Sequence, residues 1–196
     1  VTDVIGYNRY FGWYYGKPDE LGPFLDKMHA RYPAMAVGVS EYGAGGALSQ
    51  HTDNPLGGPV NVFGRPHPEE YESWVHEQSW KALKTRHYLA GVWVWNMFDF
   101  PSDLREEGDS IYLNDKGLVS FDRKVKKDAF YFYKAQWSKE PVLHITGRRY
   151  VDRAYPVTDV RAYSNADKAS LTVNGIDKGE VPCVEHICVW PEVALS

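Results

Sequence analysis

The chain has 196 residues, of which 43% are hydrophobic and 24% charged, and its formal net charge is −4. This composition suits one large or two small globular domains, and an acidic balance without a basic stripe argues against a nucleic-acid partner. No apolar run approaches the length that spans a membrane. Seven tryptophans, fourteen tyrosines and eight phenylalanines exceed the needs of an ordinary core, and aromatic faces also hold sugar rings.

The first two thirds of the sequence alternate between predicted strands and helices. Strands are predicted at residues 4–10, 36–40 and 91–96, and helices at 18–32, 68–88 and 128–137. This β-α-β-α-β-α order implies parallel strands joined by right-handed crossovers. Two segments rich in turn-forming residues, 43–66 and 98–114, are predicted as long loops, and such loops are usually functional or disordered.

The pattern changes after Pro141. Short alternating runs predict antiparallel strands at 142–145, 157–163 and 169–173, and Asn174-Gly175 is typical of a tight hairpin turn.

We therefore expect two domains, an α/β domain at 1–138 and part of a β-sandwich at 139–196. The chain begins at Val1 rather than at Met, which suggests a processed chain or an excised piece.

Two cysteines, Cys183 and Cys188, lie close together near the end of the sequence. A disulfide between them would favour an oxidising compartment, and hence a periplasmic or secreted location; reduced thiols are the alternative. With His186 between them they match no common zinc-binding pattern. We expect neither a metal ion nor a cofactor.

One acid stands out because it ends a predicted strand. Residues 36–46 form a short apolar run that ends in Glu41 and continues into a glycine-rich loop. The C-terminal ends of parallel strands open onto the active-site face of β/α folds, so a carboxylate there can act on a ligand. A capping or salt-bridged glutamate is the alternative interpretation.

Three motifs carry a resemblance to a known family: Asn8-Arg9-Tyr10-Phe11-Gly12-Trp13-Tyr14, Ser40-Glu41-Tyr42-Gly43 and Val94-Trp95-Asn96-Met97-Phe98-Asp99-Phe100. In this order and spacing they resemble the last three strands of the (β/α)8 barrel of glycoside hydrolase family 2, which contains β-galactosidases, β-glucuronidases and β-mannosidases. Residues 139–196 resemble, more distantly, an immunoglobulin-like module that follows the barrel in some bacterial β-galactosidases. The resemblance implies an α/β fold, a partial TIM (β/α)8 barrel made of its last three β/α units, followed by a β-sandwich fragment.

The resemblance also implies retaining hydrolysis, in which one carboxylate attacks the anomeric carbon and a second protonates the leaving oxygen. Glu41 matches the nucleophile, and Tyr10 matches the tyrosine that donates a hydrogen bond to it. Trp95 matches the tryptophan at the floor of the sugar site, whereas we expect Trp93 to be buried in the barrel. Asn8 would face the same site as Tyr10, because alternate residues share one face of a strand.

Asn114 and Lys116 bear on the choice of substrate. In family members that act on uronic acids, an Asn-x-Lys pair on this loop recognises the substrate carboxylate, and a lysine charge suits that role. Similar loops occur in galactosidase-like members, and Asp115 beside the lysine would weaken anion binding. We therefore expect a β-galactosidase acting on terminal β-galactosides, with a β-glucuronidase as the alternative. His51, in the loop at 43–66, is a further candidate substrate ligand.

The second carboxylate has no match in this chain. In the family it lies in an Asn-Glu pair on an earlier strand, and the sequence contains no Asn-Glu dipeptide. General acid catalysis contributes about 10²–10⁴-fold, so we expect the chain to be close to inactive alone. Two alternatives are a non-catalytic fragment that forms homo-oligomers through exposed strand edges, and a carbohydrate-binding module that performs no chemistry.

Overall fold

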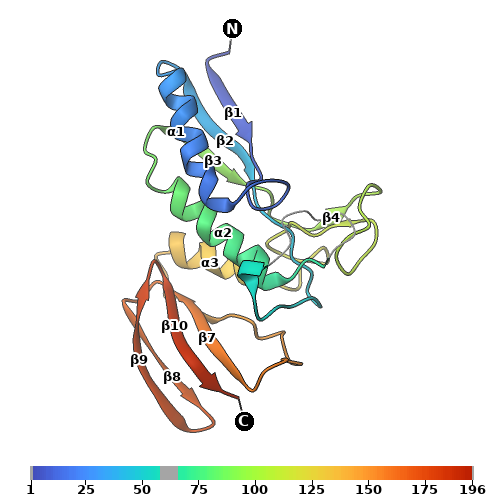
Figure 1. Ribbon diagram of the computed structural model, residues 1–196, viewed down its shortest axis with the longest axis vertical. Coiled ribbons are helices and arrows are strands. Elements are labelled where there is room, and N and C mark those ends of the chain that lie inside the picture. The colour runs from blue at the N-terminus through green and yellow to red at the C-terminus, as the bar shows by residue number, and fades with distance from the viewer. Residues whose placement is uncertain (1, 58–65, 196) are drawn as a thin grey trace.

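The computed structural model describes residues 2–57 and 66–195, which form a three-stranded parallel sheet with helices and a five-stranded antiparallel sheet (Figure 1). In Figure 1 the parallel sheet and α1 lie at one end of the molecule, and the antiparallel sheet, in orange and red, lies at the other. The helices α2 and α3 lie between the two sheets. Part of the predicted loop at 43–66 lies outside the described residues.

The parallel sheet contains β1 (Val4–Asn8), β2 (Ala36–Tyr42) and β3 (Leu89–Val94), in that order. All three strands run parallel, as the alternation of predicted strands and helices indicated. The central strand β2 is buried at Val37 and Val39 because strands flank it on both sides. It extends beyond the predicted residue 40, so that Glu41 pairs with Asn8 inside the sheet instead of following the strand.

Three α-helices accompany this sheet within the described residues. They are α1 (Leu21–Arg31), which follows a 3-10 turn at Pro18–Glu20, α2 (Glu69–Leu83) and α3 (Asp128–Trp137); a further 3-10 turn, η2, covers Pro55–Gly57. The bounds of α3 are those predicted.

The helix α2 ends at Leu83 rather than at the predicted residue 88. The residues that follow turn toward α1, where Arg86 donates from Nη2 to Asp26 Oδ2 at 2.6 Å and the Tyr88 hydroxyl donates to Asp26 Oδ1 at 2.7 Å. These tertiary contacts end the helix, although the apolar periodicity of the sequence continues.

The predicted loop at 98–114 contains a small hairpin formed by β4 (Phe100–Pro101) and β5 (Leu113–Asn114), which projects from the side of the molecule in Figure 1. Two-residue strands carry no readable periodicity, so the sequence gives no sign of the hairpin. The Asn96 N–H donates to the Lys116 carbonyl at 3.0 Å, and the Asn96 carbonyl accepts from the Leu118 N–H at 3.0 Å. These bonds dock the segment after β5 beside the end of β3.

The C-terminal region forms one antiparallel sheet with the strand order β6-β7-β10-β9-β8. Its strands are β6 (Leu143–Ile145), β7 (Val157–Ser164), β8 (Lys168–Val173), β9 (Ile176–Val184) and β10 (Ile187–Ala194). Asn174 and Gly175 have φ of 50° and 79°, the left-handed pair that a tight hairpin turn needs. Cys183 and Cys188 pair across β9 and β10 and form a disulfide, which decides between the two states considered above. Across residues 139–195 the strands make this one antiparallel sheet, without the second sheet of a sandwich.

The two regions share a hydrophobic core. One cluster of buried side chains runs from Val39 on β2 through Phe132 on α3 to Tyr163 on β7. Arg161 on β7 reinforces the contact, because its Nη2 donates to both carboxylate oxygens of Glu77 on α2, at 2.9 and 2.8 Å. The antiparallel sheet is therefore packed against the helices that cover the parallel sheet.

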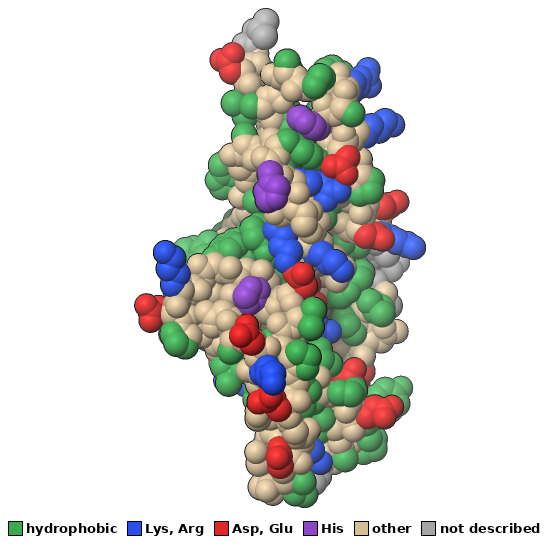
Figure 2. Space-filling view, turned by 90° about the vertical axis from the view of Figure 1, so that its left-hand side faces the viewer, with side chains coloured by type: hydrophobic (Ala, Val, Ile, Leu, Met, Phe, Trp, Pro, Cys, Tyr) green, Lys and Arg blue, Asp and Glu red, His purple; other side chains and the backbone are tan. Residues whose placement is uncertain are grey.

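The surface carries charges of both signs. On the face shown in Figure 2, acidic and basic side chains are interspersed with hydrophobic ones. None of the helices that the structure describes has the length and apolar character needed to cross a bilayer.

Candidate active site

Glu41 lies near the end of β2 and Tyr10 lies just beyond the end of β1, so parallel pairing brings both to the same edge of the sheet. The Tyr10 hydroxyl donates a hydrogen bond of 2.7 Å to Glu41 Oε2. Burial, together with this hydrogen bond, raises the pKa of the Tyr10 phenol, so the hydroxyl stays protonated as a donor. The structure thus joins the two residues that the sequence suggested as nucleophile and orienting donor.

Both side chains line a cavity of about 680 Å³ at this edge of the sheet. The predicted ligands Asn8, Trp95, Asn114 and Lys116 line it as well, together with Arg9, Tyr14, Tyr15, Phe100 and Arg105 among others. Glu41 is the only carboxylate among the described residues that line this cavity. The cavity lies in the size range that holds small ligands, and its walls are largely aromatic and basic.

Trp95 follows β3 and forms part of the cavity wall. Its main-chain N–H donates to the Tyr42 carbonyl at 2.9 Å, and its ring meets the ring of Phe100 edge-on, with centroids 5.9 Å apart. An indole held in this way can offer an apolar face to the C–H groups of a sugar ring.

Trp93, two positions earlier, is not buried as expected but is 59% exposed. Its ring lies close to Gly91 and Gly38, on a face of the sheet where no described side chain covers it fully. The expectation was wrong because no layer of the described residues packs over this face of the sheet at Trp93.

Lys116 is almost completely buried, with 2% of its surface exposed, although it lines the cavity. Its Nζ lies 5.3 Å from the ring centroid of Trp13 and 5.2 Å from that of Tyr14. Within the described residues no carboxylate lies close enough to form an ion pair with it, because the neighbouring Asp115 is paired with His67, Oδ2 to Nδ1, at 2.6 Å. Burial lowers the pKa of Lys116, as expected for an ammonium group without a carboxylate partner at contact distance.

The backbone around Lys116 is held from several sides. The Lys116 N–H donates to Asn114 Oδ1 at 3.1 Å, and the Gly117 N–H donates to Asp99 Oδ1 at 2.8 Å. A Cβ atom at position 117 would lie 2.0 Å from the main-chain nitrogen of Asp99, so only glycine permits this close approach. The ammonium group is therefore presented by a fixed segment.

The structure does not bring His51 to the cavity. Its Nδ1 lies 2.9 Å from Glu70 Oε1 on α2, and its ring stacks on that of Tyr150, with centroids 5.1 Å apart. These two contacts hold the imidazole between α2 and the segment after β6, away from Glu41.

The lining residues that were not predicted as ligands include Tyr14 and Arg105. Arg105 Nη2 donates to the Tyr14 hydroxyl at 2.9 Å, so the two side chains form one wall of the cavity. Tyr14 belongs to the first family-like motif and could have been found by its place there. Arg105 lies in an irregular loop whose sequence gives no signal.

Within the described ranges, no cluster of three or more His, Cys, Asp or Glu side chains is arranged to hold a metal ion. The arrangement that is present, a carboxylate with a phenol donor, aromatic walls and a buried ammonium group, suits a carbohydrate ligand.

Comparison with known proteins gives the same class. No protein-family model matches the chain. A β-glucuronidase from Bacteroides fragilis is 42% identical over 198 residues, which is 100% of this chain and 28% of the relative. A putative β-glucuronidase from Formosa agariphila is 29% identical, over 91% of this chain and 24% of the relative.

Solved structures agree. The crystal structure of an FMN-binding β-glucuronidase from Faecalibacterium prausnitzii L2-6 superposes with a TM-score of 0.89 at 42% identity, over 99% of this chain and 29% of that one. A putative β-galactosidase from Bacteroides fragilis gives a TM-score of 0.88 at 35% identity, over 99% of this chain and 29% of that one. The chain is homologous to a segment of glycosidases, and it spans less than a third of the relatives that it matches.

Proposed function

We propose that the protein to which these residues belong is a retaining β-glucuronidase. Its substrate would be the β-glycoside of a uronic acid, with Glu41 as nucleophile, Tyr10 as the donor that orients it, and Lys116 as the ligand of the sugar carboxylate. The observation that carries this proposal is the buried ammonium group of Lys116, which faces the Glu41 cavity without an acidic partner in the described residues.

The charge of Lys116 favours a glucuronide over a galactoside. A buried charge that lacks a partner is costly, and the carboxylate at C6 of a glucuronide would supply the missing anion. The hydroxymethyl group of a galactoside would not. The main expectation from the sequence, β-galactosidase, is therefore replaced here by its alternative, in agreement with the name of the Bacteroides fragilis relative that is 42% identical.

The proposed reaction begins with attack of the ionised Glu41 carboxylate on the anomeric carbon. A glycosyl ester forms on Glu41 as the bond to the leaving oxygen breaks, and that oxygen takes a proton from a general acid. Water then cleaves the ester with retention of configuration. Because Glu41 is the only carboxylate among the described lining residues, the general acid would come from a part of the protein beyond this segment.

The fold is part of the same proposal. The strands β1, β2 and β3 with their helices would be the last three β/α units of a TIM barrel, covering residues 1–138. The antiparallel sheet would belong to an immunoglobulin-like module beginning at residue 139. Parallel strands and a site at the C-terminal edge of the sheet support this assignment.

The test measures kcat/KM of the complete polypeptide that carries this chain, on p-nitrophenyl β-D-glucuronide and on p-nitrophenyl β-D-galactoside. We expect a preference for the glucuronide, no turnover by Glu41→Gln, and wild-type turnover by the exposed control Glu140→Gln. Lys116→Ala should lower kcat/KM for the glucuronide by about 10- to 100-fold, because hydrogen bonds to charged groups contribute about 1.5–3 kcal/mol.

The β-galactosidase remains a second candidate, favoured by the putative β-galactosidase structure at 35% identity. Two results together would favour β-galactosidase activity. The wild-type protein would prefer the galactoside, and Lys116→Ala would affect both substrates equally. The 196-residue chain alone should hydrolyse neither substrate. If it does hydrolyse one of them, and Glu41→Gln abolishes that activity, the general acid does not come from another segment.

A further inference from the structure

We propose that Arg105 is a second cationic ligand of the substrate carboxylate, next to Lys116. The inference rests on the proposed glucuronide specificity and adds a residue that determines it. Both side chains line the cavity that contains Glu41.

The backbone of Arg105 is fixed although it lies in the irregular segment between β4 and β5. Its N–H donates to the Ser102 carbonyl at 3.1 Å, and its carbonyl accepts from the Tyr112 N–H at 2.7 Å. The Ser102 N–H in turn donates to the Tyr112 carbonyl at 2.8 Å. These bonds close the loop above β4 and β5, so Arg105 is carried by the same hairpin that ends in Asn114.

The guanidinium group is held by two partners. Nη1 donates to Glu107 Oε1 at 2.8 Å, and Nη2 donates to the Tyr14 hydroxyl at 2.9 Å. The Glu107 side chain is 4% exposed, whereas that of Arg105 is 19% exposed, so the carboxylate lies beneath and the guanidinium lies at the cavity wall. An arginine has five N–H donors, and these two contacts leave others available to a carboxylate.

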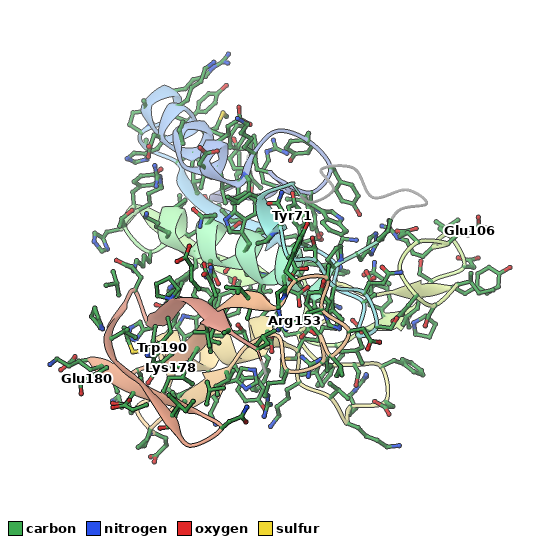
Figure 3. The ribbon with its side chains drawn as sticks, turned by 60° about the horizontal axis from the view of Figure 1, so that its bottom comes forward. Tyr71, Glu106, Arg153, Lys178, Glu180 and Trp190 are labelled. Carbon is green, nitrogen blue, oxygen red and sulfur yellow. A yellow bond between two sulfur atoms is a disulfide. The ribbon has the colours of Figure 1, made fainter. Side chains whose placement is uncertain are left out.

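Only one of the two acids that follow Arg105 in the sequence pairs with it. Glu106 is exposed and lies at the outer end of the loop, as Figure 3 shows, whereas Glu107 is buried. The loop therefore separates its two glutamates, one toward solvent and one under the guanidinium group.

Arg105 and Lys116 converge on Tyr14. The Lys116 ammonium lies 5.2 Å from the ring centroid of Tyr14 and is hydrogen-bonded to its side chain, and Arg105 donates to the hydroxyl of the same residue. Two cations thus share a phenol oxygen, with Glu107 as the one described carboxylate in an ion pair with either. The excess positive charge at this wall suits a planar anion, which an arginine can bind through two parallel hydrogen bonds.

The experiment compares kcat/KM of the complete polypeptide on p-nitrophenyl β-D-glucuronide and p-nitrophenyl β-D-glucoside, which differ in bearing a carboxylate or a hydroxymethyl group at C5 of the ring. We expect Arg105→Gln to lower kcat/KM for the glucuronide by about 10- to 100-fold, mainly through KM, and to leave that for the glucoside within about 3-fold. Arg105→Lys, which keeps the charge, should restore part of the loss for the glucuronide. The controls are Arg31→Gln, an exposed arginine on α1, and Glu106→Gln, the exposed neighbour of Glu107.

Equal losses on both substrates would overturn the inference, because they would indicate a merely structural role for Arg105. Unchanged kinetics would overturn it as well. If Arg105→Gln does not fold, the same comparison is made with Arg105→Lys, for which a selective loss supports the inference and an equal loss overturns it. The proposed function fails separately, when the wild-type protein shows no preference for the glucuronide and Lys116→Ala affects both substrates equally.

Discussion

The ammonium group of Lys127 donates a hydrogen bond of 2.6 Å to the carbonyl oxygen of Asp115, the residue that precedes Lys116. Lys127 is fully buried at the start of α3, and it also donates to Asp99 Oδ1 at 3.0 Å. Asp99 in turn accepts from the N–H of Gly117. A buried cation at the start of a helix therefore holds the segment that presents the proposed carboxylate ligand.

Replacing this cation should destabilise the protein. Lys127→Met leaves the buried Asp99 carboxylate without its cation and the Asp115 carbonyl without its Lys127 donor, and breaking a buried ion pair costs about 3–5 kcal/mol. Urea denaturation measures the free energy of unfolding. The adjacent Lys126→Met changes an exposed side chain and should stay within about 0.5 kcal/mol of the wild type. Equal effects of the two variants would contradict a special role for Lys127.

Removing the hydroxyl of Tyr10 should slow the reaction without unfolding the protein. Tyr10→Phe deletes the donor to Glu41, and a hydrogen bond to a charged group contributes about 1.5–3 kcal/mol, so kcat for the glucuronide should fall by about 10- to 100-fold. The control is Tyr7→Phe on the same strand, whose ring packs on Phe24 and does not line the cavity. An unchanged kcat in Tyr10→Phe would mean that Glu41 does not depend on this donor.

Acid should destabilise the protein through His76. Burial lowers the pKa of His76 from 6.5 to about 3, so the unfolded chain binds a proton below pH 6.5 that the folded chain does not accept until about pH 3. The free energy of unfolding should therefore fall as the pH drops from 6.5 toward 3. His76→Gln should flatten this part of the pH dependence in denaturant titrations.

The exposed His87 provides the comparison, and His87→Gln should retain the wild-type slope between pH 6.5 and 3. A His76→Gln curve that parallels the wild type would show that other groups cause the loss in acid.

Loss of the disulfide should weaken the antiparallel sheet. Cys183 and Cys188 are separated by five positions in sequence, and closing so short a loop contributes about 2 kcal/mol in the chain-entropy account. Cys183→Ala with Cys188→Ala should lower the free energy of unfolding by about this amount. The wild-type protein in a reducing agent should show the same decrease, whereas the double variant should not respond to the agent. A response of the double variant would place the effect elsewhere.

The sequence predicts the main elements for physical reasons, and one pair of the site through a family resemblance. Apolar periodicity locates the three parallel strands and α3, and parallel pairing requires that the residues after β1 and at the end of β2 meet. Glu41 stood out by its place at a strand end, and its pairing with Tyr10 followed from the resemblance to glycoside hydrolase family 2.

Other parts depend on contacts between residues far apart in the chain. The early end of α2 depends on Asp26, and the position of His51 depends on Glu70, neither of which the local pattern reveals. The Arg105 loop has strands of only two residues on either side, too short for any periodic signal. The proposed glucuronide preference rests on which partner Asp115 takes, and that partner is His67, 48 positions away in the sequence.

The segment from Asn114 to Asp128 connects the cavity to the region that carries the antiparallel sheet. At one end of the segment, Lys116 lines the cavity. At the other end, Asp128 Oδ2 accepts a hydrogen bond from the Gly147 N–H at 2.7 Å, and Asp128 Oδ1 lies 2.8 Å from His144 Nε2. Both partners belong to the region that carries the antiparallel sheet. A mutation that loosened this attachment would therefore reach the cavity as well, and substitutions at the two ends of the segment should have coupled effects.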